Sequence, residues 1–263
     1  MKSLENYLHM AKKLEGKKVK DSIDSLYNYR KQLDIFNDKP ELHRKLTKGV
    51  FARFIEEDFF GLKINSRSEA DFNDVNLELK VTGIKYIPRN NLYNAKERLV
   101  LTMINYEELC YYENWTDNKH LFNKLNNILL IIYLYEKRPV QFEDFKVIHS
   151  FLWSPNEEQR EIIQHDYTII RNKVLNGEVI KERYTNFLAN CPKHSGGFNK
   201  KNPSLSKRQS IDKRHPNLDF AERRAFCIKN KVLSQLIADS LGVQLRKIGP
   251  SVGLYKEDFP NFM

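Results

Sequence analysis

An uninterrupted run of eight apolar residues, ILLIIYLY at positions 128–135, is the strongest constraint on how this chain can fold. The run is too short to cross a bilayer, which requires about 20 apolar residues. An apolar run of this length, followed by polar residues, favours a strand buried in a sheet. The stretches 99–104 and 147–153 have the same character, so we expect buried strands there as well.

A second stretch, VNLELKVT at residues 75–82, alternates strictly between apolar and polar side chains. Alternation with a period of two predicts a strand whose two faces differ. The four apolar side chains share one face, and Asn76, Glu78 and Lys80 share the other. The sequence therefore places a glutamate and a lysine side by side on one strand.

Helical spacing and stop signals surround these strands. Helices are expected within residues 1–35, at 49–61 ending at Gly61, and at 232–241. Residues 154–157, SPNE, predict a capping box with Pro155 at the first helical position, opening a helix that runs to about residue 175. A last strand is expected at 224–229, and residues 193–214 form a long basic loop.

Composition narrows the class of protein. The 263 residues are 41% hydrophobic, which excludes wholesale disorder, and the net charge of +10 indicates a polyanionic partner. Cys110, Cys191 and Cys227 show no CxxC spacing, so we expect three reduced thiols and no zinc site. Reduced thiols and the absence of a membrane-spanning run predict a soluble protein of the cytoplasm. No signal-peptide run, paired histidine spacing or phosphate-binding glycine loop is present in the sequence.

The best candidate for chemistry is Asp71 followed by Glu78-Leu79-Lys80. Two carboxylates converging at a strand end suit Mg²⁺, which prefers oxygen ligands, and the Leu79 carbonyl is a plausible further ligand. An ammonium beside the metal can orient water and stabilise a charged transition state. The alternative is an ordinary exposed ion pair, and Asp74 is a second candidate carboxylate.

Several stretches between about residue 4 and residue 241 resemble, in order, the MutH family. This family comprises the mismatch-repair nicking endonuclease MutH and related GATC-cutting type II restriction endonucleases of the Sau-three-AI type. KERLVLTMINYEE is closest to the restriction branch, whereas WSPNEE matches the mismatch-repair branch. The other similar stretches are GVFARFIEEDFFG, DFNDVNLELKVT, HLFNKLNNILLI, YTNFLANCPK and RRAFCIKNKVLSQL.

The resemblance implies an α+β, restriction-endonuclease-like fold, with a mixed central sheet flanked by helices and two lobes around a DNA-binding cleft. It implies a nuclease domain at residues 1–241, with 242–263 as a tail or the start of a second domain. Full restriction enzymes of this branch carry such a second domain.

The resemblance also assigns roles to site residues. Asp71, Glu78 and the Leu79 carbonyl would bind Mg²⁺, and Lys80 would position the attacking water. Glu57, four residues before Gly61, falls on the family's catalytic glutamate, and Lys124 falls on a second functional lysine.

Double-stranded DNA is the implied partner. Lys193 and Lys229 lie in resembling stretches, Lys48 precedes the helix glycine, and further DNA contacts are expected from the basic loop at Lys200, Lys201, Lys207 and Arg208. One departure concerns base recognition: the arginine and tyrosine that contact GATC in the mismatch-repair branch correspond to Cys191 and Cys227. Cysteine cannot make the bidentate contact of arginine with guanine.

The expected function is a Mg²⁺-dependent type II restriction endonuclease that leaves 5′-phosphate and 3′-hydroxyl ends at GATC. A DNA methyltransferase would be its genetic partner, with no membrane association. With a single active site, the expected monomer would cut both strands either as a dimer on DNA or by two sequential nicks. The alternatives are a strand-nicking repair endonuclease and a catalytically silent DNA-binding domain.

Overall fold

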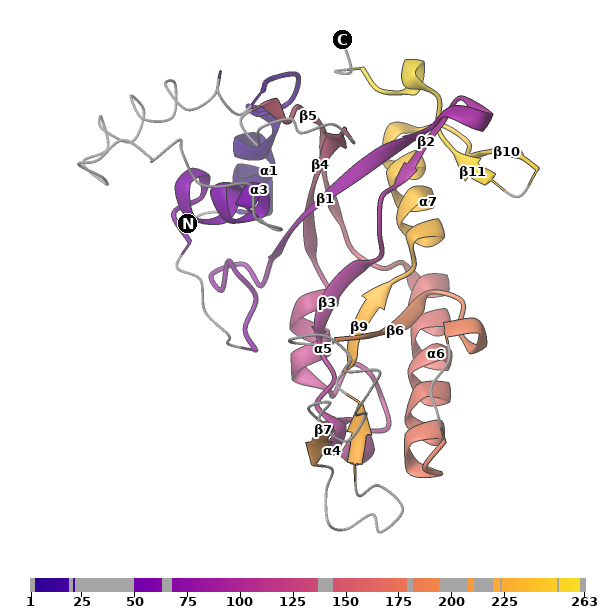
Figure 1. The fold of residues 1–263 in the computed structure, drawn as a ribbon. Helices are drawn as coiled ribbons and strands as arrows, with labels where there is room; N and C mark the ends of the chain where they lie inside the picture. Colours follow the sequence, from indigo (N-terminus) through magenta and orange to yellow (C-terminus); the bar gives the residue numbers. More distant parts are fainter. Residues whose placement is uncertain are drawn as a thin grey trace.

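The computed structural model describes residues 3–18, 21, 50–62, 68–136, 144–178, 182–193, 208–210, 220–222, 224–249 and 251–260. Its centre is a four-stranded mixed sheet with the strand order β2-β1-β4-β5 (Figure 1). Strand β1 (Glu78–Ile87) runs parallel to β4 (Ile128–Tyr135) and antiparallel to β2 (Leu92–Ala95). Strand β4 runs antiparallel to β5 (Val147–Trp153). The mixed sheet confirms the expected fold class.

Both faces of this sheet are covered. Leu129 and Ile131 of β4 pack into one apolar cluster with α1 (Leu4–Lys12), α3 (Val50–Arg53) and the π-helix Phe54–Phe59. Leu130 and Ile132 pack into a second cluster with α6 (Glu157–Leu175) and α7 (Asn230–Leu241). Because β4 contacts a layer on each side, every position is apolar and no alternation is visible in its sequence.

A three-stranded sheet with the order β3-β9-β6 extends the second layer (Figure 1). Its strands are β3 (Leu99–Met103), β9 (Arg224–Ile228) and β6 (Leu188–Pro192). The short helices α4 (Tyr106–Tyr111) and α5 (Lys119–Leu125) follow β3. The remaining elements are the hairpins β7 (Arg208–Ser210) with β8 (Phe220–Glu222) and β10 (Arg246–Ile248) with β11 (Ser251–Gly253), and the 3₁₀ turns Pro88–Asn90, Glu182–Tyr184 and Lys256–Asp258.

Several element boundaries differ from the sequence-based expectation, and two of these differences matter for the site and for helix capping. The strand expected at 75–82 begins at Glu78, because Asn76 adopts a left-handed backbone with φ of 48° inside a turn. The helix α6 is capped by Asn156, which forms the capping box with Gln159. The Ser154 hydroxyl does not cap the helix; it donates to Asn127 Oδ1 at 2.7 Å.

The helix expected at 49–61 is present but changes type along its length. Residues 50–53 are α-helical, residues 54–59 form a π-helix, and Gly61 ends the segment with φ of 69°. Residues 22–49 and most of the basic loop lie outside the described residues. The segment after residue 241 packs against the body, since Leu254 and Phe259 are buried in the second cluster. The expected domain division remains a prediction.

The expectation of three free thiols is wrong. Cys191 on β6 and Cys227 on β9 form a disulfide, while Cys110 is a buried cysteine that is not disulfide-bonded. In the antiparallel register Cys191 lies opposite Ala225 and Cys227 opposite Ala189, so the two cysteines are diagonal neighbours. Their separation of 36 residues gave no sequence signal for this pairing. No helix in the described part of the chain is long and apolar enough to span a membrane.

Candidate active site

Asp71 and Glu78 are brought together by a tight turn before β1. Phe72 and Leu77 exchange backbone hydrogen bonds of 2.9 and 3.1 Å, which folds residue 71 back onto the start of the strand. The Asp71 amide then donates to Glu78 Oε2 at 3.3 Å, and the Leu79 amide donates to Asp71 Oδ2 at 3.0 Å. The turn therefore holds the two carboxylates side by side, as their spacing predicted.

Glu78 is buried between two lysines. Its side chain is 2% exposed, with Lys80 Nζ 2.6 Å from Oε1 and Lys124 Nζ 2.7 Å from Oε2. Lys124 Nζ also lies 3.8 Å from Asp71 Oδ1. This burial excludes the alternative of an ordinary exposed ion pair on a solvated strand face. Two carboxylates and two ammonium groups form one compact cluster.

Lys124 reaches the cluster because of the parallel register of β1 and β4. Helix α5 ends just before β4, and the Asn127 carbonyl accepts from the Glu78 amide at 3.0 Å. Glu78 lies opposite Ile128 in this register. The last turn of α5 is thereby held beside the start of β1, which positions Lys124 next to Glu78.

Burial changes the acidity of the cluster. It raises the pKa of the Glu78 carboxyl, with Asp71 adding to the rise and Lys80 and Lys124 opposing it. Burial also raises the pKa of Glu56, and the negative charge of Asp71 raises it further. These carboxyls hold protons at higher pH than ordinary glutamates.

Glu56 is a site residue that the sequence reasoning missed. The charges of Asp71, Lys80 and Glu78 affect the pKa of its carboxyl, so Glu56 lies within electrostatic range of the cluster. The expected residue was its neighbour Glu57. Both glutamates lie in the π-helix Phe54–Phe59, and π-turns of this kind are common at functional sites. The role of Glu57 remains a prediction.

The donor set fits Mg²⁺. Among the described residues no three histidine, cysteine, aspartate or glutamate side chains gather as a metal-ligating group. Mg²⁺ does not require one, because it is commonly bound by one or two carboxylates, water and substrate phosphate. Asp71 and Glu78 supply the carboxylates. The Leu79 amide points towards Asp71, and the carbonyl of a strand residue points to the same side as its amide.

Asp74, the second candidate carboxylate, has a different environment. Its two oxygens each accept from the Tyr7 hydroxyl at 3.1 Å. Burial and the neighbouring Asp74 raise the pKa of Tyr7 to about 12, so this hydroxyl remains a donor at neutral pH. Asp74 thus ties the turn to α1.

The residues expected to bind DNA fall into two groups. Lys193 lines a surface hollow at the end of β6. Lys229 lies just before α7, and its ammonium donates to the Thr185 carbonyl. Lys48, Lys200, Lys201 and Lys207 lie outside the described residues, and only the backbone of Arg208, in β7, is described. Their DNA contacts remain predictions.

Comparison with known proteins shows which family this chain resembles. Residues 60–166 match the family model described as DNA mismatch repair enzyme MutH. The chain is also 31% identical, over 184 residues, to the type II restriction enzyme Sau3AI of Staphylococcus aureus. This alignment covers 69% of the chain but only 35% of that enzyme, so the chain spans about a third of the relative's length. The family match includes Asp71, Glu78, Lys80 and Lys124 and ends within α6, before β6 and β9.

Proposed function

The chain belongs to the family of MutH and the Sau3AI-type restriction enzymes, and we propose that it is a Mg²⁺-dependent DNA endonuclease. The observation that carries this proposal is the buried cluster of Asp71 and Glu78 with Lys80 and Lys124. Burying a carboxylate between two lysines costs desolvation free energy, so this arrangement is weak evidence for a purely stabilising role. Such a cluster is well suited to binding a cation and a phosphate together.

Asp71, Glu78 and the Leu79 carbonyl would hold the metal. When bound, Mg²⁺ supplies Lewis-acid stabilisation of the charge on the phosphate. The Lys80 ammonium, fixed by Glu78, orients the water that attacks phosphorus. The bond to the 3′ oxygen breaks, leaving a 5′-phosphate and a 3′-hydroxyl, which takes up a proton.

Lys124 and Glu56 would support this step from the edges of the cluster. The Lys124 ammonium can move from Glu78 to a non-bridging phosphate oxygen, where it stabilises negative charge as the transition state forms. The Glu56 carboxylate has a raised pKa and lies within electrostatic reach of Lys80. It can accept a hydrogen bond or a proton from the attacking water.

Restriction cleavage at GATC is the specific form of the proposal, with double-stranded DNA as substrate and a DNA methyltransferase as genetic partner. The relationship to Sau3AI supports this form. The match to the model described as mismatch repair enzyme MutH supports strand nicking as the second candidate. The two forms differ in whether one strand or both are cut.

The test is cleavage of an unmethylated supercoiled plasmid with Mg²⁺, beside a GATC-methylated copy. Discrete linear fragments at GATC sites, absent from the methylated plasmid, are the expected result. Open circles without linear product would favour nicking. Fragments at other sites would remove the GATC assignment.

A Lys80→Ala variant is the control for the mechanism. It should bind the plasmid with nearly the same affinity and fail to cut it. Binding by the wild type without cleavage, at any Mg²⁺ concentration, would instead identify a silent DNA-binding domain and overturn the proposal.

A further inference from the structure

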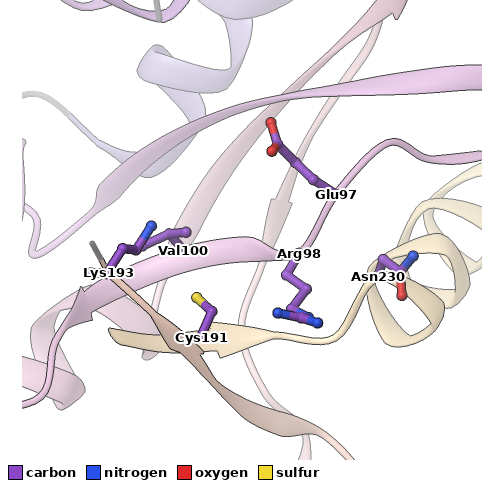
Figure 2. A pocket seen from close by; sticks show the side chains of 6 residues that line it. All are labelled: Glu97, Arg98, Val100, Cys191, Lys193 and Asn230. Carbon is purple, nitrogen blue, oxygen red and sulfur yellow. The ribbon is translucent and has the colours of Figure 1, made fainter. Parts of the chain in front are cut away.

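A surface hollow of about 350 Å³ lies over the three-stranded sheet, beside the disulfide of Cys191 and Cys227. The segment before β3, strand β3 itself, the end of β6 and the start of α7 surround it. Figure 2 shows the Cys191 sulfur pointing from β6 towards Val100, with Lys193 on one side and Arg98 on the other. The residues that line the hollow are Glu97, Arg98, Val100, Cys191, Lys193 and Asn230.

The strand register explains why the disulfide lies at this hollow. Cys191 is paired with Ala225, and Cys227 is paired with Ala189 on one side and Val100 on the other. Directly opposite residues of an antiparallel pair point to the same side of a sheet, so these side chains share one face. Most of them are alanine or cysteine, whose small size leaves this part of the face shallow.

The two sulfurs of the disulfide differ in access. Cys191 lines the hollow and is 8% exposed, whereas Cys227 is fully buried. In thiol–disulfide exchange a thiolate attacks one sulfur and expels the other. A reagent in the hollow therefore reaches Cys191, and the sulfur expelled is that of Cys227. The Ala225 carbonyl lies 3.3 Å from Cys227 Sγ, so the released thiol has an acceptor already in place.

The charge of the lining indicates what kind of reagent would enter. Arg98 and Lys193 are cationic, Glu97 is the one acidic residue of the lining, and Figure 2 shows its carboxylate apart from the two cations. A guanidinium binds a carboxylate through two parallel hydrogen bonds, and the Asn230 amide is a further donor. Net positive charge in a hollow raises the local concentration of anions. The lining therefore favours a small molecule that carries carboxylates.

We infer that this hollow is a thiol–disulfide exchange site for a small anionic thiol, one that carries carboxylates besides its sulfur. Arg98 and Lys193 hold the carboxylates, and the thiolate of the reagent attacks Cys191 Sγ. The bond to Cys227 breaks, Cys227 leaves as a thiolate and takes up a proton, and Cys191 is left in a mixed disulfide with the reagent. The inference does not depend on the proposed endonuclease function.

A second molecule of the same thiol completes the reduction. Its thiolate attacks the mixed disulfide at the sulfur of the reagent, so Cys191 leaves as a thiolate and is then protonated. The two small thiols are oxidised to one small disulfide, and the protein disulfide is reduced to two thiols. The reverse reaction restores the disulfide when the small disulfide is in excess.

The test compares three thiols of different charge on the native protein. Glutathione is anionic, 2-mercaptoethanol is neutral and cysteamine is cationic. The disulfide is first verified by mass spectrometry before and after reduction, and exchange is then followed by the mass of the acid-quenched protein. Each rate is divided by the rate of the same thiol with hydroxyethyl disulfide in solution, because thiols differ in intrinsic reactivity.

The normalised rate should be highest for glutathione and lowest for cysteamine. The advantage of glutathione over 2-mercaptoethanol should be on the order of 10-fold, as expected for a charge-assisted hydrogen bond. It should largely disappear in about 1 M salt, where exposed charges are screened within about 3 Å. After denaturation and labelling with N-ethylmaleimide, peptide mapping should find glutathione on Cys191 and the maleimide on Cys227 and Cys110.

Variants test the two cations. Arg98→Gln and Lys193→Gln should each slow the reaction of glutathione by about 3- to 10-fold and leave that of 2-mercaptoethanol nearly unchanged. The neutral thiol thereby reports whether the variant is folded. The matched control is Arg89→Gln, which removes the same charge from an exposed arginine in the 3₁₀ turn after β1. It should leave the rates of all three thiols unchanged.

Several results would overturn the inference. One is a protein that contains no disulfide, or one whose disulfide is reduced only after the protein unfolds. Another is an equal normalised rate for the three thiols, which would mean that the charges of the hollow do not select the reagent. Glutathione found on Cys227, or equal effects of Arg98→Gln and Arg89→Gln, would likewise contradict it.

Discussion

The Lys124 ammonium lies 2.7 Å from Glu78 Oε2, although the two residues are 46 positions apart and belong to different elements. The contact joins the last turn of α5 to the first residue of β1. Lys80 approaches the other oxygen of the same carboxylate at 2.6 Å. Glu78 therefore organises both lysines of the site.

Removing the Lys124 charge should reduce cleavage strongly. Lys124→Gln deletes an ammonium that stabilises the phosphate, so the single-turnover rate should fall by about 10²- to 10³-fold. The matched control is Lys119→Gln on the same helix, whose side chain is exposed. Equal rates for the two variants would contradict the role of Lys124.

Glu56 and Glu57 can be separated by parallel substitutions. Glu56 interacts with Asp71, Lys80 and Glu78, so Glu56→Gln should slow cleavage by about 10- to 100-fold. Glu57→Gln should change the rate by less than about threefold on the same scale. Rates are measured with a saturating plasmid concentration. The reverse order would assign the role to Glu57, as the resemblance implied.

Cleavage should depend on pH through the raised pKa of Glu78. Protonation removes a metal-binding carboxylate, so activity should fall on the acidic side at a higher pH than for an ordinary glutamate. Because Mg²⁺ competes with the proton for the carboxylate, this fall should move to lower pH as the Mg²⁺ concentration is raised. EDTA should abolish cleavage. A pH–rate profile at two Mg²⁺ concentrations checks both statements.

His149 should make stability depend on pH. Burial lowers its pKa from the ordinary value of 6.5, and its Nε2 lies 3.0 Å from the Ser240 hydroxyl. The unfolded chain therefore binds the proton more tightly than the folded protein does. The contribution of His149 to stability is present above pH 6.5 and is lost as the pH falls through the folded pKa. Melting curves between about pH 5 and 8 should show a smaller acid loss for His149→Gln.

Asp166 should be essential for stability. It is fully buried on α6, and its carboxylate accepts from the amides of Asn186, Phe187 and Leu188 at 2.9, 2.6 and 2.9 Å. Asp166→Ala leaves these amides without their acceptor, so the free energy of unfolding should fall by about 3–5 kcal/mol. Urea unfolding measures this change. Asp239→Ala on the exposed end of α7 is the control and should cost less than about 1 kcal/mol.

The sequence predicted local features well. The bounds of β4 and β5 match the apolar runs, and the alternation correctly placed Glu78 beside Lys80. The turn that joins Asp71 to Glu78 also follows from their short separation. These features depend on residues a few positions apart, for which side-chain periodicity carries the information.

Features that depend on contacts between residues far apart in the sequence could not be predicted from local sequence patterns. The position of Lys124 came only from resemblance, because the β1–β4 register determines it. Glu56 was missed because the resemblance pointed to its neighbour Glu57, and the sequence pattern gave no sign of the π-helix that contains both. The Cys191–Cys227 pairing depends on the register of β6 and β9. The cap at Asn156 rather than Ser154 was also not predicted, and the Ser154 hydroxyl instead donates to Asn127 Oδ1.

The parallel pairing of β1 with β4 has a consequence for how the chain acquires activity during folding. Asp71 and Glu78 meet through a local turn, whereas Lys124 arrives only when the long connection between the two strands has closed. Closing a parallel pair is slow, because the entropy of a long loop is lost before its contacts form. The carboxylate pair can therefore form first, without Lys124. Until β1 and β4 have paired, the site lacks Lys124, so catalytic competence requires that the sheet has closed.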